Sequence, residues 1–258
     1  ILKRHERLWF SNTRGVRKAN LVFAFSNLEF EEYLKCKISI HYFAEHYCHI
    51  KREDGSIGPM KLREYQKDII RLYKKHRRLC IIQSRQSGKT TVATVIILHY
   101  ALFNKSVSVA LLSNKGSSAQ EIMSRIQRAY ENLPPFLKGG VKEWNKNNIE
   151  FDNGSKIQSS ATSGSAARGG SKNMVYIDEQ AFIRGWDEFY SSVFPTLASG
   201  KNTKIIFTTT PNGLNHAYDY YVGAVEGTNG FVAKMVTWDQ VPGRDDAWRQ
   251  DTLAAMNY

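Results

Sequence analysis

The sequence predicts an α/β fold in which a mostly parallel sheet is flanked by helices. From residue 79 onward, apolar runs of strand length alternate with segments of helical length, an order typical of parallel strands joined by right-handed crossovers. Three of these runs end in polar residues, and the carboxyl ends of parallel strands form the edge of a sheet where ligands bind. The 258 residues suffice for one large core with a small appendage.

Helices are expected in the N-terminal third. The first 34 residues are basic and poorly periodic, with a short helix over 28–35, and a second helical stretch covers 38–47. The segment REDGSIGP at 52–59 is rich in turn-forming residues. A further helix over 62–76 places a set of side chains on one face: Leu62, Tyr65, Ile69, Leu72 and Tyr73.

Strands and helices alternate through the rest of the chain. Strands are expected at 79–83, 107–112, 149–151, 156–160, 174–178, 204–209 and 231–236, and helices at 90–103, 117–132 and 214–224. Two prolines, Pro134 and Pro135, end the second of these helices, and the turn DNG at 152–154 joins two strands as a hairpin. After residue 238 the pattern weakens. We expect a core over residues 35–237, with residues 1–34 and 238–258 packing together as a small subdomain.

The formal net charge of +12 is unevenly distributed. Residues 1–78 hold 18 Lys and Arg against 9 Asp and Glu, whereas the other 180 residues hold 18 against 15. A basic N-terminal third favours an anionic partner, most simply nucleic acid, although a solvated basic face would give the same count.

Cysteine usage and hydropathy favour an intracellular protein. Cys36, Cys48 and Cys80 have no CxxC spacing, which argues against a disulfide framework and a zinc cluster. The apolar run at 91–103 is too short to span a bilayer, and no signal peptide is visible, so no membrane partner is expected.

The segment SRQSGKTT at 84–91 follows a short apolar strand and precedes a long apolar helix. It matches the second half of the P-loop pattern, with Gln83 at the position of the first glycine. Gly88 lets the backbone approach a phosphate, Lys89 reaches the outer phosphate oxygens, and the Thr90 hydroxyl binds Mg²⁺. The candidate nucleotide-binding residues are therefore Ser84, Arg85, Gln86, Ser87, Gly88, Lys89, Thr90 and Thr91.

Two further predicted strands end in acidic or hydroxyl side chains that suit a P-loop enzyme. NMVYIDEQAF at 173–182 places Asp178 to hold Mg²⁺ through water and Glu179 to orient or deprotonate the attacking water. A capping pair before a helix is the alternative. KIIFTTTPNG at 204–213 places Thr208, Thr209 and Thr210 where they can sense a γ-phosphate, although β-propensity and a turn also explain them. The fold prediction narrows to a P-loop NTPase of the RecA or ASCE type that uses ATP and Mg²⁺.

SRQSGKTT, MVYIDEQAF and TTTPNGLNHAYD together resemble the ATPase domain of the large terminase subunit of tailed bacteriophages, most closely its T-even type. The likeness extends through YFAEHYC, LREYQKDII, VKEWNKNNIEFDNGSKI and AVEGTNGF and covers roughly residues 15–238. It implies an ATP-driven motor that moves double-stranded DNA into a procapsid. The implied setting is the host cell cytoplasm during phage assembly, as a ring of copies on the portal protein with the small terminase subunit, and not in the mature virion.

The resemblance also implies residue roles. Lys89 and Thr90 are the phosphate and Mg²⁺ residues, Asp178 is the Walker B carboxylate and Glu179 the catalytic one. The resemblance makes Thr208, Thr209 and Thr210 the coupling motif. Tyr65 and Gln66 match an adenine-recognition motif, with an aromatic face for stacking and an amide for the base edge; core packing is the alternative for Tyr65.

Two arginines compete for the role of arginine finger. Arg85 lies inside the loop and can offset charge on the γ-phosphoryl group of its own subunit. Arg168, in the Gly- and Ser-rich segment SAARGGS, lies eleven residues before Glu179. The resemblance implies that an arginine here reaches a neighbouring subunit, and a basic loop that touches DNA is the alternative. We hypothesise that Arg168 is the trans finger and Arg85 a cis sensor.

The family's large subunit also carries a C-terminal nuclease domain of the RNase H type. Only twenty residues follow Trp238, so we expect this chain to lack that domain and to cleave no DNA. Two alternatives stay open: a helicase-like DNA translocase of another P-loop class, and a catalytically weak DNA-binding assembly module.

Overall fold

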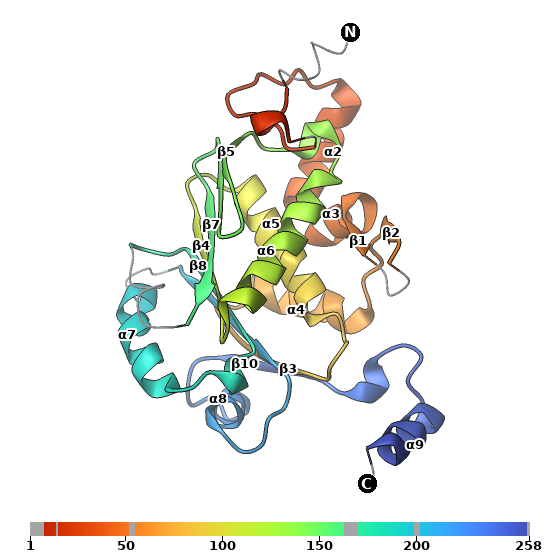
Figure 1. Ribbon diagram of the computed structural model, residues 1–258, viewed down its shortest axis with the longest axis vertical. Coiled ribbons are helices and arrows are strands. Elements are labelled where there is room, and N and C mark those ends of the chain that lie inside the picture. Colours follow the sequence, from red (N-terminus) through yellow and green to blue (C-terminus); the bar gives the residue numbers. More distant parts are fainter. Residues whose placement is uncertain (1–7, 14, 52–54, 163–169, 199–201, 257–258) are drawn as a thin grey trace.

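An eight-stranded sheet forms the centre of the computed structural model, which describes residues 8–13, 15–51, 55–162, 170–198 and 202–256 (Figure 1). The strand order is β10-β3-β9-β8-β4-β7-β6-β5. Six parallel strands come first: β10 (Val232–Val236), β3 (Arg78–Gln83), β9 (Lys204–Thr209), β8 (Met174–Asp178), β4 (Ser108–Ser113) and β7 (Lys156–Ala161). The strands β6 (Asn148–Phe151) and β5 (Val141–Trp144) then extend the sheet in antiparallel fashion. The predicted mostly parallel α/β sheet is confirmed.

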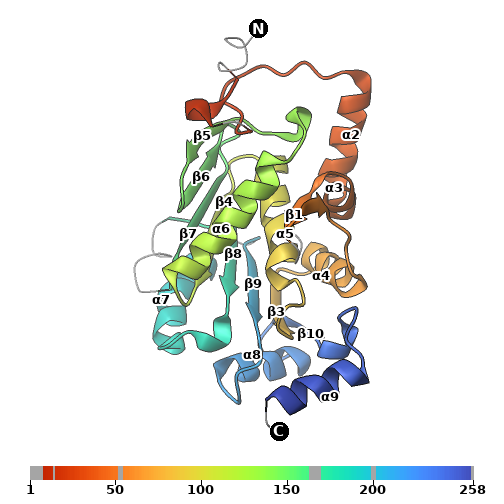
Figure 2. The same ribbon diagram turned by 45° about the vertical axis from the view of Figure 1, so that its right-hand side comes forward.

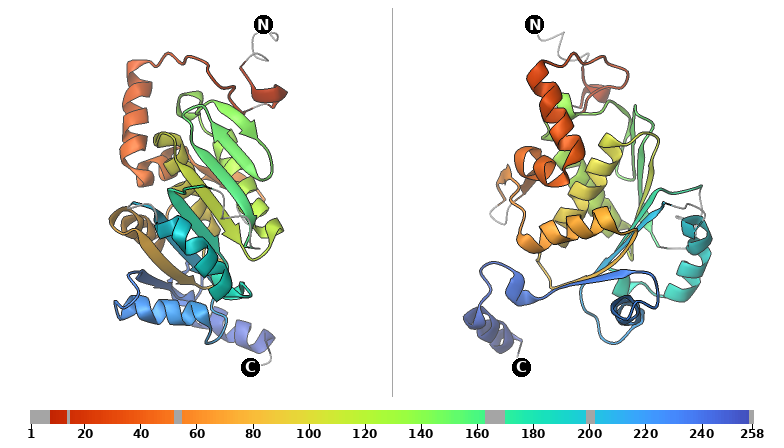
Figure 3. Two further views of the ribbon diagram at one scale, coloured as in Figure 1. Left: turned by 90° about the vertical axis from the view of Figure 1, so that its left-hand side faces the viewer. Right: turned by 180° about the vertical axis from the view of Figure 1, so that it is seen from behind.

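Helices cover both faces of this sheet (Figures 2 and 3). The first face carries α3 (Ile40–Tyr47), α4 (Glu64–Lys75), α5 (Lys89–Phe103) and α6 (Gly116–Glu131), and the other carries α7 (Trp186–Ala198) and α8 (His216–Val225). Side chains alternate between the faces: in β8, Met174 and Tyr176 join the first core, whereas Val175 and Ile177 join the second. Burial on both faces explains why the central strands read as continuous apolar runs.

The N-terminal third adds a helix and a hairpin to the first face. The helix α2 (Asn27–Ile38) begins at a capping box, in which Ser26 and Glu29 bind each other's backbone amides, and it is longer than predicted. The strands β1 (His49–Lys51) and β2 (Ile57–Pro59) pair on either side of the expected turn. Four short 3-10 helices join the larger elements: η1 (Phe10–Asn12), η2 (Pro135–Leu137), η3 (Gln180–Phe182) and η4 (Trp238–Gln240).

Apart from the 3-10 helices, five elements of the described chain were not predicted from the sequence: β1, β2, β5, α7 and α9 (Asp246–Ala255). The helix α7 contains Pro195. A proline inside a helix has no N–H to donate to the preceding turn, so its presence argued against a helix here. Its apolar side chains nevertheless recur at helical spacing, and Trp186, Phe189 and Val193 are buried against the sheet. Tertiary packing therefore determines this helix more than local propensity does.

The expected small subdomain is not formed, because the described parts of the two chain ends lie at opposite ends of the molecule (Figure 1). On the N-terminal side, Arg17 Nη1 donates to the Lys138 carbonyl at 2.8 Å, and Lys18 bridges Val141 at the outer edge of the sheet. On the C-terminal side, Arg244 Nη2 donates to the Arg85 carbonyl at 2.8 Å. Each end completes a different part of the core, and the C-terminal one reaches the phosphate loop.

The buried His99 side chain makes stability depend on pH. Its Nε2 donates to the Cys36 carbonyl at 2.9 Å, which links α5 to α2, and burial lowers its pKa from 6.5 to about 4. Because the folded-state pKa is the lower one, the unfolded chain binds this proton more tightly. The contribution of His99 is complete above pH 6.5 and is lost as the pH falls towards 4.

We expect His99 to cost about 2 kcal/mol of stability between pH 7 and pH 5. The variant His99→Gln keeps a side-chain donor but does not titrate. Urea unfolding at both pH values should therefore show a loss that is smaller by this amount in the variant. Equal losses in the two proteins would contradict the prediction.

Candidate active site

The phosphate loop has the geometry that its sequence predicts. It joins β3 to α5, and Gly88, the N-cap of that helix, has φ +77°, a conformation that favours glycine. A Cβ at Gly88 would also lie only 2.7 Å from Gln66 Nε2. Among the described residues, no side chain caps the N-terminus of α5, and its first turn has no acidic residue, so its backbone N–H groups are available to bind an anion.

Gln83 explains why the loop tolerates the loss of its first glycine. The side chain is buried, and its Oε1 accepts a hydrogen bond from Ser87 Oγ at 3.1 Å. This contact spans the loop from its first residue to the residue before Gly88. The glutamine thus braces the turn from inside, which a glycine cannot do.

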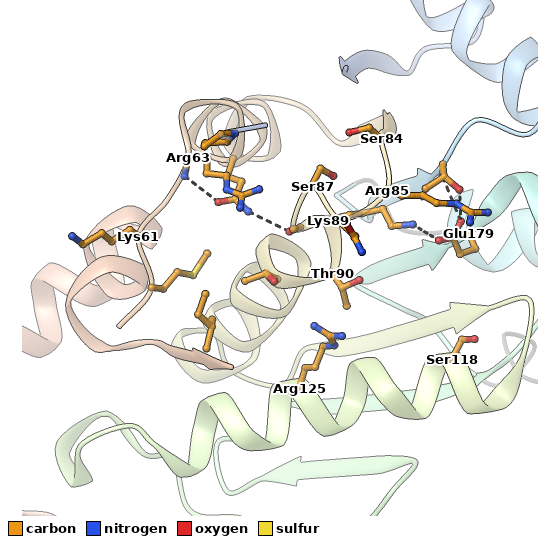
Figure 4. Close-up of a pocket in the computed structure, with 18 of the residues that line it drawn as sticks. Lys61, Arg63, Ser84, Arg85, Ser87, Lys89, Thr90, Ser118, Arg125 and Glu179 are labelled. Atoms are coloured by element: carbon orange, nitrogen blue, oxygen red, sulfur yellow. Dashed lines mark hydrogen bonds and ion pairs between the residues drawn. The ribbon is translucent and has the colours of Figure 1, made fainter. Parts of the chain in front are cut away.

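Lys89 and Glu179 converge at one place (Figure 4), and Asp178, the last residue of β8, also contacts Lys89 there. The Lys89 ammonium lies 2.6 Å from Glu179 Oε1 and 3.2 Å from Asp178 Oδ1. The side chains of Lys89 and Asp178 are only 10% and 8% exposed, whereas that of Glu179 is 29% exposed. A partly desolvated lysine therefore faces two carboxylates, of which Glu179 is the one more open to solvent.

The three threonines at the end of β9 act on different partners. Thr208 Oγ1 donates to Asp178 Oδ1 at 2.8 Å and also hydrogen-bonds the Tyr176 hydroxyl, whose pKa is raised by burial. Thr209 Oγ1 accepts from the Ala181 amide at 3.1 Å. The Thr210 amide and hydroxyl both lie 3.4 Å from Glu179 Oε2. Only Thr210 lines the cleft, whereas Thr208 and Thr209 hold the acidic strand end from behind.

The loop forms part of a cleft of about 1420 Å³. The described part of its lining carries six basic side chains, Lys61, Arg63, Arg85, Lys89, Lys115 and Arg125, and one acidic side chain, that of Glu179. Arg125 is paired with Glu121 at 2.7 Å. Apolar side chains line another part of the cleft: Ile50, Pro59 and Met60. The cleft suits a ligand with a polyanionic end and an apolar, planar end.

The predicted adenine pair braces the loop. The Tyr65 side chain is buried and does not line the cleft; its hydroxyl donates to the Ser87 carbonyl at 2.7 Å and accepts from Arg63 Nη1. Gln66 does line the cleft, but its Nε2 donates to the Gly88 carbonyl at 3.2 Å and its Oε1 accepts from the Arg63 amide. For Tyr65, the core-packing alternative describes its position.

The structure describes one of the two candidate arginine fingers, Arg85. Arg85 is exposed and lines the cleft, with its side chain on the same side of the loop as Lys89 and Glu179 (Figure 4). Arg168 lies outside the described residues. Arg63 and Arg244 were missed by sequence reasoning: Arg63 falls within the LREYQ segment that was singled out, whereas Arg244 lies in a tail without periodicity and carries no local signal.

The parallel sheet, the phosphate loop and the acidic strand end define a P-loop NTPase fold of the RecA-like class. The chain belongs to the family of T4-like terminase large subunits, N-terminal part, whose family model matches residues 80–256. This finding confirms the resemblance that the motifs indicated.

Solved structures of phage terminases share the fold. The HK97 bacteriophage large terminase is 18% identical, with a TM-score of 0.66 over 85% of this chain and 47% of that one. The Thermus phage P74-26 large terminase ATPase domain is 18% identical, with a TM-score of 0.62 over 75% of this chain and 88% of that one. The large terminase of the thermophilic bacteriophage D6E in complex with ADP is 11% identical, with a TM-score of 0.57 over 74% and 50%. The chain thus spans about half the length of the HK97 and D6E proteins.

Among the described residues, no helix is both long and apolar enough to cross a membrane.

Proposed function

We propose that this chain is the ATP-hydrolysing motor domain of a phage large terminase and that hydrolysis drives double-stranded DNA into a procapsid. The observation that carries the proposal is the 2.6 Å contact between Lys89, the first residue of α5, and Glu179, which directly follows β8. Among the described residues, no side chain caps the N-terminus of α5 beside this contact. Family membership supports it, as does the D6E relative whose structure holds ADP.

The residues present fit an ATP·Mg²⁺ ligand. The N–H groups at the start of α5, with Lys89 and Arg85, would bind the phosphates, and the apolar side of the cleft at Ile50 and Met60 would receive the base. Thr90 and Asp178 supply the hard oxygen donors that Mg²⁺ prefers, and the metal would neutralise charge on the phosphates. Asp178 does not line the cleft, which suits a contact through water.

Glu179 then has a role that depends on what Lys89 binds. In the structure the two side chains form an ion pair and neutralise each other. When phosphate oxygens take the ammonium of Lys89, the Glu179 carboxylate becomes free to accept a proton from an attacking water. Arg85 and Lys89 both offset charge on the γ-phosphoryl group as it transfers.

Release of phosphate from ATP by this chain, with Mg²⁺ present, tests the proposal. We expect slow turnover that rises with protein concentration, because a neighbouring copy supplies part of the site. In this proposal Arg168 is the arginine finger that reaches the site of a neighbouring copy, and Arg85 senses the nucleotide bound by its own chain. Absence of any hydrolysis across the concentration range would overturn the assignment of an ATPase.

The proposed partners follow from the family. They are double-stranded DNA, the portal protein, the small terminase subunit and further copies of this chain arranged as a ring. The proposed setting is the host cell cytoplasm during phage assembly, with no membrane involved.

A basic cluster at the opposite edge of the sheet from the phosphate loop offers a place for DNA phosphates. It consists of five consecutive residues, Lys74, Lys75, His76, Arg77 and Arg78, at the junction of α4 and β3. A hollow of about 280 Å³ is lined by His76, Arg77 and Arg78. No member of the cluster has an ion-pair partner in the part of the chain that the structure describes.

We expect the double variant Lys75→Glu/Arg77→Glu to bind duplex DNA more weakly than the unsubstituted chain. Loss of two phosphate contacts should also lower the slope of log affinity against log salt by about 2. The control Lys142→Glu/Lys146→Glu makes the same change in net charge at exposed positions on β5 and the turn after it. Equal losses in both double variants would show that only net charge matters, and would contradict the prediction.

A further inference from the structure

Glu179 is held in a backbone conformation that residues with a Cβ rarely adopt. It has φ +50° and ψ +46°, in the left-handed region, and it leads directly into the turn of η3. Such a conformation persists only where the surroundings hold it. The side chain of Gln180 does not help, because it is buried and neither of its amide atoms has a hydrogen-bond partner among the described residues.

Two backbone hydrogen bonds form the turn itself, from the Phe182 amide to the Glu179 carbonyl and from the Ile183 amide to the Gln180 carbonyl. The other contacts to the turn come from one segment, residues 209–216, which runs from the end of β9 to the start of α8. Thr209 Oγ1 accepts from the Ala181 amide. The Ala181 carbonyl accepts from Asn212 Nδ2 at 3.2 Å and from Asn215 Nδ2 at 3.1 Å. His216 Nε2 lies 2.7 Å from the Gln180 carbonyl, and since a carbonyl can only accept, the ring nitrogen donates. Every hydrogen-bonding group of the backbone at residue 181 is thus bound by this segment.

The same segment also binds the Glu179 side chain. The Thr210 amide and hydroxyl face Glu179 Oε2. Glu179 is therefore held at both ends by residues 209–216: at its carboxylate by Thr210, and at the turn behind it by the two asparagines and the histidine.

Asn215 and His216 connect this arrangement to the helices of the second face. Asn215 Oδ1 accepts from the Ala217 amide and caps α8, while its Nδ2 donates to both the Ala181 and Asn212 carbonyls. The His216 ring stacks on Trp186 at 5.1 Å with an interplanar angle of 6°. A shift of the Glu179 turn would therefore be transmitted to α7 and α8.

We propose that Asn212, Asn215 and His216 are positioning residues for Glu179. They hold the turn after it, so that its carboxylate lies beside Lys89 and the cleft. The inference rests on the proposed ATPase function. It implies that these three side chains, together with the threonines at the end of β9, connect the nucleotide site to α8.

The double variant Asn212→Ala/Asn215→Ser tests the proposal. Serine keeps an oxygen that can cap α8 but is too short to reach the Ala181 carbonyl, so the two contacts are lost and the cap is kept. We expect kcat for ATP hydrolysis to fall roughly ten- to hundredfold, as a displaced catalytic group predicts, while KM changes by less than about twofold. His216→Phe keeps a ring against Trp186 and should lower kcat by roughly three- to tenfold, the equivalent of one hydrogen bond.

Asn229→Ser is the matched control. Asn229 Nδ2 donates to the Tyr220 carbonyl at 2.7 Å, so the same substitution breaks the same kind of bond at the other end of α8. We expect its kcat to be unchanged. If kcat of the double variant falls no further than that of this control, or falls only together with a raised KM, the positioning role is wrong.

Hydrogen exchange separates this inference from the ATPase assignment. The double variant should exchange the backbone amides of residues 181–183 faster than the unsubstituted chain does, whether or not that chain hydrolyses ATP. An inert unsubstituted chain would refute the ATPase function alone. Unchanged exchange in this segment would refute the positioning role even in an active enzyme.

Discussion

Replacing Glu179 by Gln lowers kcat for ATP hydrolysis by roughly a hundred- to a thousandfold, the range that a lost general base predicts. Glutamine has the same shape as glutamate and can still accept a hydrogen bond from Lys89 through its Oε1. It cannot take a proton from water at neutral pH. We therefore expect ATP to bind about as tightly as before, because the phosphate loop is unchanged. Phosphate release measures the loss of turnover, and a binding titration with ATP measures the affinity.

The control for this prediction is Glu121→Gln. Glu121 lies on α6 and pairs with Arg125, a residue that lines the same cleft. The substitution removes the same charge near the nucleotide without touching the strand end. We expect activity close to that of the unsubstituted chain. Turnover that survives Glu179→Gln would remove Glu179 from the mechanism.

The parts of the site that could be predicted are those fixed by short local patterns. The phosphate loop is one, because a turn of this kind requires glycine at position 88 and a lysine directly after it. The strand followed by Asp178 and Glu179 is another, because four apolar residues followed by two acids leave few other arrangements. Neither prediction required knowledge of distant contacts.

The threonines and Tyr65 show why the rest could not be predicted. Hydroxyls at the end of a strand were expected to face the ligand, but side chains alternate along a strand, so successive threonines have different neighbours. Which neighbour each one meets depends on β8, thirty residues away in the chain. Likewise the position of Tyr65 on the apolar helical face predicted that its side chain is buried. It did not predict that its hydroxyl donates to the Ser87 carbonyl.

The chain ends also show that contacts between distant residues could not be predicted from the sequence. A weak pattern at both ends suggested that they pack together, yet Arg17 and Arg244 bind opposite parts of the core. Arg244 reaches the Arg85 carbonyl, and its guanidinium lies 4.7 Å from the ring centre of Trp248, which in turn stacks on Trp238. Such long-range contacts leave no periodic trace in sequence.

Lys89→Met weakens binding of ATP or ADP by about a hundredfold or more, since charge-assisted hydrogen bonds to phosphate oxygens are lost. Methionine has nearly the same length and packs in a similar volume, so the loop keeps its shape. The measurement is a binding titration with ADP, which does not depend on hydrolysis. Lys115→Met is the control, because Lys115 lines the cleft but is not bonded to the acidic pair.

The same substitution has a second effect, which follows from the ion pairs of Lys89 with Asp178 and Glu179. Without Lys89, the carboxylates of Asp178 and Glu179 lose the cation that lies 3.2 Å and 2.6 Å from them, so the protein should be destabilised at neutral pH by about 1–3 kcal/mol. Adding Glu179→Gln removes one of the two charges and should restore part of this stability, but none of the nucleotide affinity. If the double variant unfolds at the same denaturant concentration as Lys89→Met alone, the ion pair between Lys89 and Glu179 does not stabilise the folded protein. Recovery of stability without recovery of binding would show that Lys89 exchanges one anionic partner for another.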